Sequence, residues 1–206
     1  MKVEQERSIV RRQRIVDAAL EVFSRRGYRD AAMDEIASEA ETSKGGLYFH
    51  FPNKQAIFLA LLDRTARLLR ERAEEAITAH DGPLARLDAA PLVVIRTFAG
   101  HRSLARLFLI EAFGAGREFN RRMAEIHAEF AELITRHLDE AVAQGAIQPL
   151  DTKLAGKAWF GALNEVVTAW VLDDEPGRLE DSYPALRVLL LRSVGVLEQE
   201  GPRTGV

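Results

Sequence analysis

The sequence predicts an all-α fold of about nine helices, and three observations support this expectation. Apolar residues recur with the 3.6-residue period of helices along the chain, whereas the alternation typical of strands is hard to find. Only 7 prolines occur in 206 residues, and most of them fall between the periodic stretches. Apolar residues make up 47% and charged residues 29% of the chain, as in globular proteins with a buried core.

Three helices are expected in the N-terminal quarter. The first covers about 8–26, where apolar side chains form one stripe, and Gly27 ends it. The second covers about 33–40 and the third about 43–49, with a break of three or four residues between them. Two short helices separated in this way have the outline of a helix-turn-helix, whose second helix enters the major groove of DNA.

A longer helix and then five more are expected in the rest of the chain. Asn53 is a good N-cap for a helix over about 54–79, which the turn at 80–83 ends. Pro91 leaves 84–88 open as either the start of the next helix or a separate turn. The other helices are expected at about 84–100, 102–113, 117–144, 151–173 and 179–198, followed by a frayed end over 201–206.

The composition excludes several kinds of site. The chain has no Cys, so disulfides, thiolate zinc sites, iron–sulfur clusters and cysteine nucleophiles are excluded. Its apolar runs are far shorter than the ~18–20 residues of a membrane span, and its charged N-terminus lacks the apolar segment of a signal peptide. No metal-ligand spacing and no catalytic or nucleotide-binding fingerprint is present. We therefore expect a cytoplasmic protein that is not an enzyme, uses no metal or cofactor and contacts no membrane.

The segment 42–54 differs from the rest of the chain in its charge. It contains Lys44, His50 and Lys54 and no acid, although the formal net charge of the chain is −3. Two adjacent glycines cost its short helix about 1 kcal/mol each relative to Ala, which suggests that something must approach this backbone closely. Lys54 opposes the dipole of the helix that it begins, an arrangement that makes sense if a phosphate binds there.

The order of residues from Ile36 to Lys54 resembles a signature of the TetR family of bacterial transcriptional regulators. In this chain the pattern runs I-A-x-x-A-x-x-S-K-G-x-L-Y-x-H-F-x-N-K, and the whole match covers about 11–62. The stretch that ends in Arg26-Gly27-Tyr28 is also similar to the first helix of that family and the corner after it. The resemblance implies a helix-turn-helix DNA-binding domain over 1–54 and a helical effector-binding and dimerisation domain over 55–206.

The resemblance also implies which residues contact double-stranded DNA. Phosphate contacts are expected from Tyr48, His50 and Lys54, and major-groove contacts from Thr42, Ser43, Lys44 and Gly46. Lys44 is the expected base-reading residue, because Lys can bind guanine, and Phe49 is expected in the domain core. Three positions depart from the family pattern: Ala32 where Thr is frequent, Glu41 where the turn often has Gly, and Gly46 where Thr or Ser is frequent.

The C-terminal two-thirds is expected to hold an effector pocket, again by resemblance. The candidate ligand contacts are Arg96, His101, His127, Trp159, Asn164 and Thr168. Each could instead be a satisfied core group or a surface residue, because buried polar groups are normally hydrogen-bonded within the protein. The many aromatic side chains of this region suit a small hydrophobic or aromatic effector.

The last two long helices carry more apolar residues than one buried face needs, and the resemblance implies a homodimer formed through them. Such a dimer would place two recognition helices on successive major grooves of a palindromic operator. The expected function is therefore a sequence-specific transcriptional regulator, a repressor that its effector releases from DNA. Two alternatives stay open: a helical ligand carrier or enzyme with a vestigial DNA-binding domain, and a purely structural dimerisation module.

Overall fold

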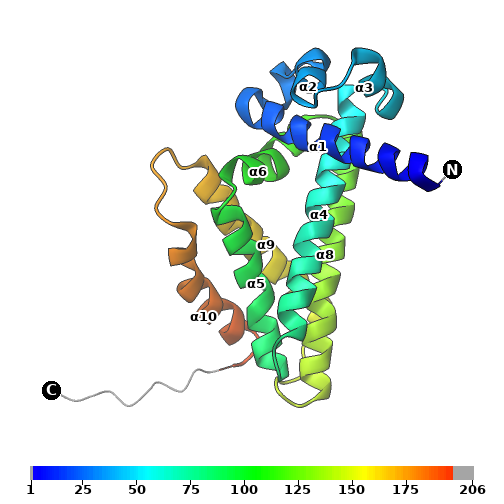
Figure 1. Cartoon of the computed structure of the whole chain (residues 1–206). Helices are drawn as coiled ribbons and strands as arrows, with labels where there is room; N and C mark the ends of the chain where they lie inside the picture. Colours follow the sequence, from blue (N-terminus) through cyan, green and yellow to red (C-terminus); the bar gives the residue numbers. More distant parts are fainter. Residues whose placement is uncertain (1, 197–206) are drawn as a thin grey trace. The chain divides into compact units, whose positions relative to one another are not determined.

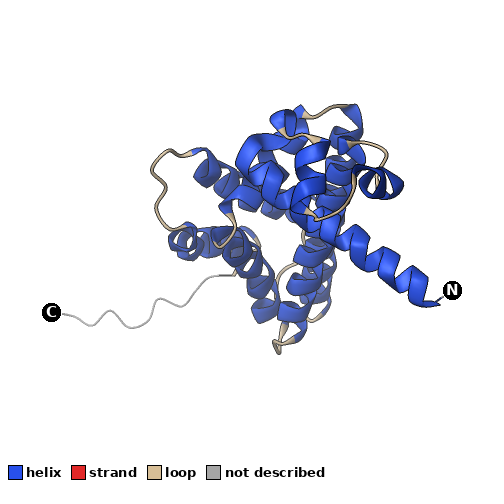
Figure 2. Ribbon diagram, turned by 45° about the horizontal axis from the view of Figure 1, so that its top comes forward, coloured by secondary structure: helices blue, strands red, loops and turns tan. Residues whose placement is uncertain are grey.

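The computed structural model describes residues 2–196, and all regular structure within them is helical (Figure 2), which confirms the all-α expectation. There are nine helical segments in this range if the contiguous α6, η1 and α7 count as one and the contiguous η2 and α10 count as another. The elements are α1 (Lys2–Asp30), α2 (Met33–Glu39), α3 (Lys44–His50), α4 (Lys54–Thr78), α5 (Pro83–Ala99), α6 (Arg102–Arg106), the π-helix η1 (Leu107–Glu111), α7 (Ala112–Gly114), α8 (Arg117–Ala143), α9 (Thr152–Leu172), the 3₁₀-helix η2 (Leu179–Ser182) and α10 (Tyr183–Ser193). The end 201–206, expected to fray, lies outside the described residues.

One expected break is confirmed and another is not a break in the structure. Gly27, at φ 77 and ψ 162, is not helical, so it ends the first straight part of α1, and a short helical turn follows it to Asp30. Pro91 is buried inside α5, and 84–88 belong to the same continuous helix. A proline removes one backbone hydrogen bond, but the packing of Ile95 and Phe98 on the buried face holds the helix together across the gap.

The chain forms two compact units, of which the first comprises 1–68 and 101–125 and the second 69–100 and 126–206. The long helices α4 and α8 therefore each contribute to both units. The limits expected for the functional domains, 1–54 and 55–206, stay a prediction.

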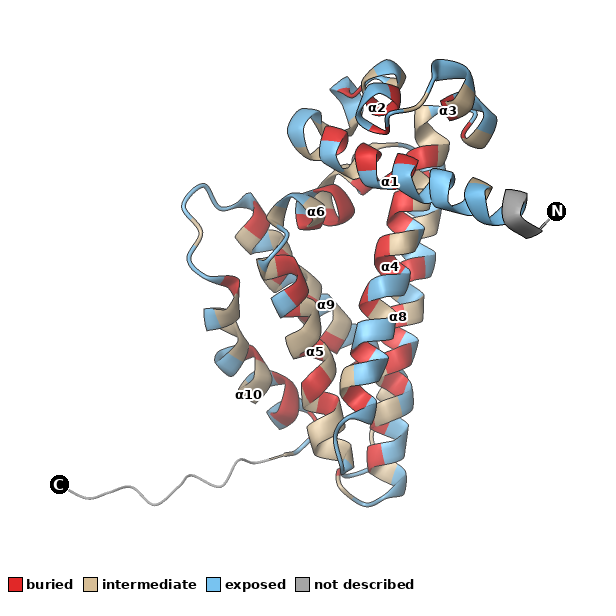
Figure 3. Cartoon of the chain, viewed as in Figure 1, coloured by how far each residue is buried: buried red, intermediate tan, exposed pale blue. Residues whose placement is uncertain are grey.

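The core of the first unit is a cluster of aromatic rings from α1, α4 and α8. Phe23, Phe58 and Phe119 are almost fully buried, and the ring of Phe58 lies 5.3 Å from each of the other two. Tyr28 stacks on Phe58 at 4.5 Å. Buried and exposed residues alternate along α4 as the helix turns (Figure 3). Because each buried ring contributes on the order of 2–3 kcal/mol, the cluster fixes the end of α1 against α4.

A contact distant in sequence completes this arrangement at Gly27 and Tyr28, which we call the α1 corner. The backbone N–H of Tyr28 donates to the carboxylate of Glu111 at 2.6 Å, and the same carboxylate lies beside Gly27. Glu111 ends the π-helix η1, which lies beside α1 together with α6 (Figure 1). The segment 102–114 thereby holds the chain where it leaves α1 and enters the helix-turn-helix.

In the second unit, α10 is attached to α5 and α9 by polar contacts within apolar surroundings. The hydroxyl of Tyr183 donates to the Asp88 carbonyl at 2.6 Å and to the Asp88 carboxylate, which also accepts from Arg187 Nε at 2.8 Å. Burial, followed by the hydrogen bond to Asp88, raises the pKa of Tyr183. The indole Nε1 of Trp159 donates to Ser193 Oγ at 3.0 Å, which ties α9 to the end of α10.

The helices α8 and α9 approach closely at Gly156. A Cβ atom there would lie 2.8 Å from the carbonyl oxygen of Ala131 and would meet Thr135 Oγ1. That hydroxyl already donates to the Ala131 carbonyl at 2.8 Å, so it has little freedom to move aside. The close approach therefore requires a residue without a side chain at position 156.

We expect Gly156→Ala to lower the free energy of unfolding by about 1–3 kcal/mol, because the added methyl group overpacks the contact. Urea-induced unfolding followed by circular dichroism measures the change. Gly161→Ala is the matched control on the same helix, since a Cβ there meets nothing within 4 Å. This control is expected to gain up to about 1 kcal/mol from its higher helix propensity. Equal stabilities for the two variants would contradict the close approach.

Candidate nucleic-acid interface

The turn between α2 and α3 has a backbone conformation that favours glycine. Glu41 has φ 48, in the left-handed region that most residues avoid. The carbonyl of Glu41 accepts a hydrogen bond from Arg14 Nη2 at 3.1 Å, so α1 helps to hold the turn. The left-handed backbone at this position explains why the family pattern often has Gly in the turn, although this chain has Glu41 there.

Ser43 caps α3. Ser43 Oγ accepts from the backbone N–H of Gly46 at 3.0 Å. A Cβ at Gly46 would lie 2.7 Å from Thr42 Oγ1 and 3.2 Å from Ser43 Oγ, so a side chain there would require the Thr42 hydroxyl to turn aside and the cap to shift slightly. Gly45 is different, because a Cβ there meets nothing within 4 Å. No neighbouring atom therefore requires a glycine at position 45.

Lys44 and Tyr48 lie on one exposed face of α3. Lys44 Nζ forms an ion pair with Asp34 of α2 at 2.9 Å, with both side chains about two-thirds exposed at 65% and 67%. The hydrogen bond and the charge of Asp34 raise the pKa of Lys44. Tyr48 is 43% exposed and follows four residues later, so it shares this face. An exposed ion pair of this kind is weak, and Lys44 can exchange Asp34 for another acceptor at little cost.

Lys54 has a structural role that sequence reasoning did not predict. Its Nζ donates to the carbonyls of Arg29 at 2.7 Å and Ala31 at 2.8 Å, and lies 4.9 Å from the ring centre of Tyr28. Burial lowers the pKa of this ammonium group. The predicted cap of α4 is confirmed, since Asn53 Oδ1 accepts from the backbone N–H of Ala56 at 2.8 Å. Lys54 therefore fastens the α1 corner to the start of α4, whatever else it binds.

His50 lies at the end of α3 next to positive charge from α1. Its side chain is partly buried, and this burial together with the charges of Arg11 and Arg12 lowers its pKa. The guanidinium of Arg12 also lies 4.7 Å from the ring centre of Phe51. The basic N-terminal part of α1 and the end of α3 thus form one positively charged surface.

The expectation that Phe49 packs in the core is wrong, because its side chain is 80% exposed. Leu47 and Phe51 occupy the core instead, at 0% and 2%. Residues of an α-helix are about 100° apart, so a residue two positions after Leu47 lies almost on the opposite side of the helix. The only ring contact described for Phe49 is with its neighbour His50, at 5.2 Å.

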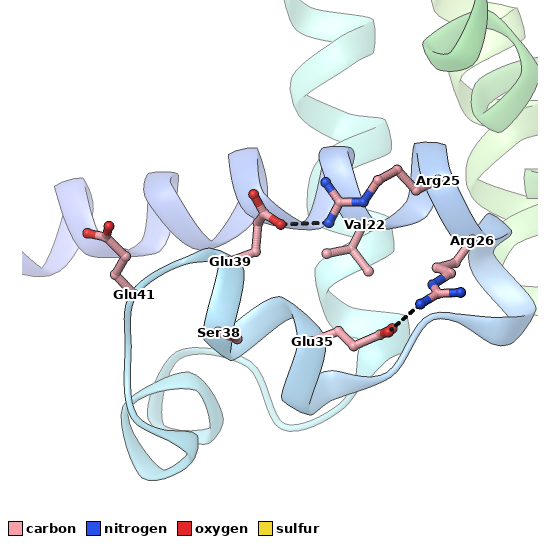
Figure 4. A pocket seen from close by; sticks show the side chains of 7 residues that line it. All are labelled: Val22, Arg25, Arg26, Glu35, Ser38, Glu39 and Glu41. Atoms are coloured by element: carbon pink, nitrogen blue, oxygen red, sulfur yellow. Dashed lines mark hydrogen bonds and ion pairs between the residues drawn. The ribbon is translucent and has the colours of Figure 1, made fainter.

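Two carboxylates of α2, Glu35 and Glu39, line an open groove of about 470 Å³ between α1 and α2 (Figure 4). Two ion pairs cross the two helices there: Arg25 with Glu39 at 2.6 Å and Arg26 with Glu35 at 3.3 Å. Glu41 also lines the groove. These acids leave the groove unsuited to a phosphate backbone, and the ion pairs hold α2 against α1.

The structure places the candidate effector residues in different surroundings. Trp159 is buried beside two small cavities of about 10 Å³ each, roughly the space of one water molecule. The His127 ring lies 4.8 Å from that of Phe160, and burial lowers the pKa of His127. Thr168 buries its hydroxyl oxygen, which has no hydrogen-bond partner among the described residues. Asn164 is partly buried, whereas Arg96 and His101 are exposed.

Within 2–196, no three His, Asp or Glu side chains come together as a metal ion would require. None of the helices in that range combines the length and the apolar character needed to cross a membrane.

Comparison with known proteins identifies both parts of the chain. Residues 15–61 match the model described as bacterial regulatory proteins, tetR family, and residues 80–174 match a tetracyclin repressor-like C-terminal domain. The fatty acid metabolism regulator protein of Bacillus subtilis is 31% identical over 165 residues, which cover 78% of this chain and 84% of that protein. The regulator SrpR of Pseudomonas putida is 29% identical over 201 residues, covering 93% and 87%.

Solved structures agree with these matches. The regulator FadR of Bacillus subtilis in complex with stearoyl-CoA has a TM-score of 0.80 and 28% identity, covering 90% of this chain and 99% of its own. FadR of Bacillus halodurans, a fatty acid degradation regulator, has a TM-score of 0.82 and 26% identity, covering 91% and 97%.

We expect Lys54→Met to lower the free energy of unfolding by about 1–3 kcal/mol, because two carbonyls lose a charged hydrogen-bond donor. Urea-induced unfolding without DNA measures this. Lys44→Met is the control, since Lys44 is exposed and paired only with an exposed acid, and its unfolding midpoint should not change. An unchanged midpoint for Lys54→Met would mean that the two carbonyl contacts do not stabilise the α1 corner.

Proposed function

This chain belongs to the TetR family of bacterial regulatory proteins, and we propose that it is a homodimeric, sequence-specific repressor that a fatty acyl-CoA releases from a palindromic operator. One observation carries the DNA-binding part of this proposal. In an acidic chain, α3 and its flanks (42–54) contain no carboxylate and expose Lys44, Tyr48 and Gly45 beside the basic part of α1. A short helix with this character suits entry into the major groove.

The proposed DNA interface consists of seven residues: Thr42, Ser43, Lys44, Gly46, Tyr48, His50 and Lys54. Tyr48 and His50 donate to phosphates, and Lys44 leaves Asp34 to reach a base edge or a phosphate. Thr42, Ser43 and Gly46 lie at the capped start of α3, the end of the helix that would enter the major groove. Lys54 adds positive charge to this end of the interface while it holds the α1 corner.

The proposed dimer forms through α9 and α10. Three large apolar side chains of these helices are well exposed: Leu154 at 64%, Leu172 at 58% and Leu189 at 59%. Exposed leucines on neighbouring helices are typical of a surface that a second copy covers. Two-fold symmetry would then set the two α3 helices one turn of DNA apart, about 34–36 Å.

The proposed effector is a fatty acyl-CoA, which is more specific than the hydrophobic or aromatic molecule expected from the sequence. Support comes from the similarity of this chain to FadR of Bacillus subtilis, whose structure contains stearoyl-CoA. The candidate contacts remain Arg96, His101, His127, Trp159, Asn164 and Thr168. Thr168 is the strongest of these, because its buried hydroxyl would gain a partner in the complex.

A fluorescence-anisotropy titration tests the proposed function, with duplexes that tile the region upstream of the chain's own gene. We expect one duplex to bind tightly at low salt, and about 10–100-fold more weakly after addition of stearoyl-CoA, within the usual range of allosteric coupling. Free CoA and free stearate are the controls and should have little effect. Binding of no duplex contradicts the DNA-binding proposal, whereas binding that stearoyl-CoA leaves unchanged contradicts only the effector.

The proposed phosphate contact of His50 predicts that DNA binding strengthens at lower pH. Burial and the nearby Arg side chains keep the pKa of His50 below its usual value in the free protein, and a bound phosphate would raise it. DNA binding then takes up a proton, so the Kd falls as the pH is lowered from about 7.5 towards 5.5. Anisotropy titrations at several pH values at constant ionic strength measure this.

His50→Gln is the control for the pH series, because Gln is a donor that does not titrate in this range. Its Kd should change much less with pH. Protonation of His50 also opposes folding, since its pKa in the folded state is the lower one, so circular dichroism must show intact helices at each pH. The same pH dependence in both proteins would remove His50 from the phosphate contacts.

A further inference from the structure

The helix α3 presents two stripes of different chemistry to solvent. Lys44 and Tyr48 are four residues apart and form a polar stripe. Gly45 and Phe49 are also four residues apart and form a neighbouring stripe that has no side-chain donor or acceptor. A base edge that meets this second stripe cannot hydrogen-bond to its side chains.

Phe49 has the largest exposed fraction among the large apolar side chains of the described residues, at 80%. The core of the first unit does not need it, because Leu47 and Phe51 already fill the space beneath α3. Beside it, Gly45 has open space where a Cβ would stand. The stripe therefore combines an exposed ring with a stretch of backbone that a partner can approach closely.

The charge around this stripe indicates which partner covers it. His50 follows Phe49 on α3, and Arg11 and Arg12 of α1 are close enough to His50 to lower its pKa. Lys44, which pairs with Asp34, lies at the other end of α3. No carboxylate occurs in 42–54. An apolar ring inside a positively charged surface suits a partner that carries negative charge at its edges and an apolar group at its centre. The major groove of DNA has this pattern, with phosphates along both sides and the C5-methyl group of thymine on its floor.

We propose that Phe49 is a specificity-determining residue that packs against the C5-methyl group of one thymine in each half of the operator, with Gly45 leaving room for the base edge. This inference rests on the proposed function, because it requires α3 in the major groove. Thymine is the base whose groove edge carries a methyl group, so the contact would select T over C, A and G at that position.

The test removes only the methyl group. Duplexes that bind the full chain are selected from a random-sequence pool, and each thymine of a selected duplex is replaced in turn by deoxyuridine. We expect one replacement per half-site to weaken binding about fourfold, the factor that burial of one methyl group is worth. With Phe49→Ala the same replacements should have no effect, because the shortened side chain does not reach the methyl group. Phe49→Leu should keep part of the difference.

Phe113→Ala is the matched control, since Phe113 is another exposed phenylalanine of the first unit, at 45%. It should keep the full fourfold sensitivity to deoxyuridine. Because Phe49 is 80% exposed, its replacement should leave the thermal unfolding midpoint unchanged, so a loss of binding would not come from unfolding.

Two results would overturn the inference while the proposed function stands. In one, the wild-type chain binds its selected duplex but no deoxyuridine replacement weakens binding. In the other, a replacement weakens the wild-type chain and Phe49→Ala by the same factor. If the chain selects no duplex at low salt, the proposed function fails, and this inference fails with it.

Discussion

The arrangement of the helix-turn-helix depends on how the chain is held at the α1 corner. Four interactions meet there: the Tyr28 N–H bonds to Glu111, the Tyr28 ring stacks on Phe58, and Lys54 binds the carbonyls of Arg29 and Ala31. The groups that hold the corner belong to η1 and to α4, which begins at Lys54. Each interaction contributes only about 1–3 kcal/mol of stability, but together they fix the direction in which the chain enters α2.

This constraint matters because α3 is too short to be stable alone. An isolated helix of 7 residues would not form in water, so α3 depends on the Ser43 cap and on the burial of Leu47 and Phe51. Only one side of such a helix can be buried, and the other side must face solvent. The side that remains carries Lys44, Tyr48 and Phe49, so the packing that stabilises α3 also decides which residues a DNA groove would meet.

The charges of the first unit are separated in a way that serves the same surface. Glu35 and Glu39 of α2 and Glu41 of the turn lie along the groove with Arg25 and Arg26, whereas Asp34 of α2 pairs with Lys44. The arginines Arg11, Arg12 and Arg14 lie on the exposed side of α1, and Arg14 binds the turn before α3. An acidic chain can therefore keep a positively charged surface, because its acids are taken up in ion pairs elsewhere.

Periodicity, caps and motif spacing by themselves determined the helical class, the short α2 and α3, the cap at Asn53 and membership of the family, because these depend on residues close together in sequence. Only the tertiary structure decided the rest. It placed Phe49 outside the core, made Ser43 the cap of α3, directed Lys54 to the α1 corner and continued α5 through Pro91. Glu111 is 83 residues from Tyr28, and no local pattern links them. Which side of a helix is buried, and which carbonyl meets a distant side chain, follows from the packing of several helices at once.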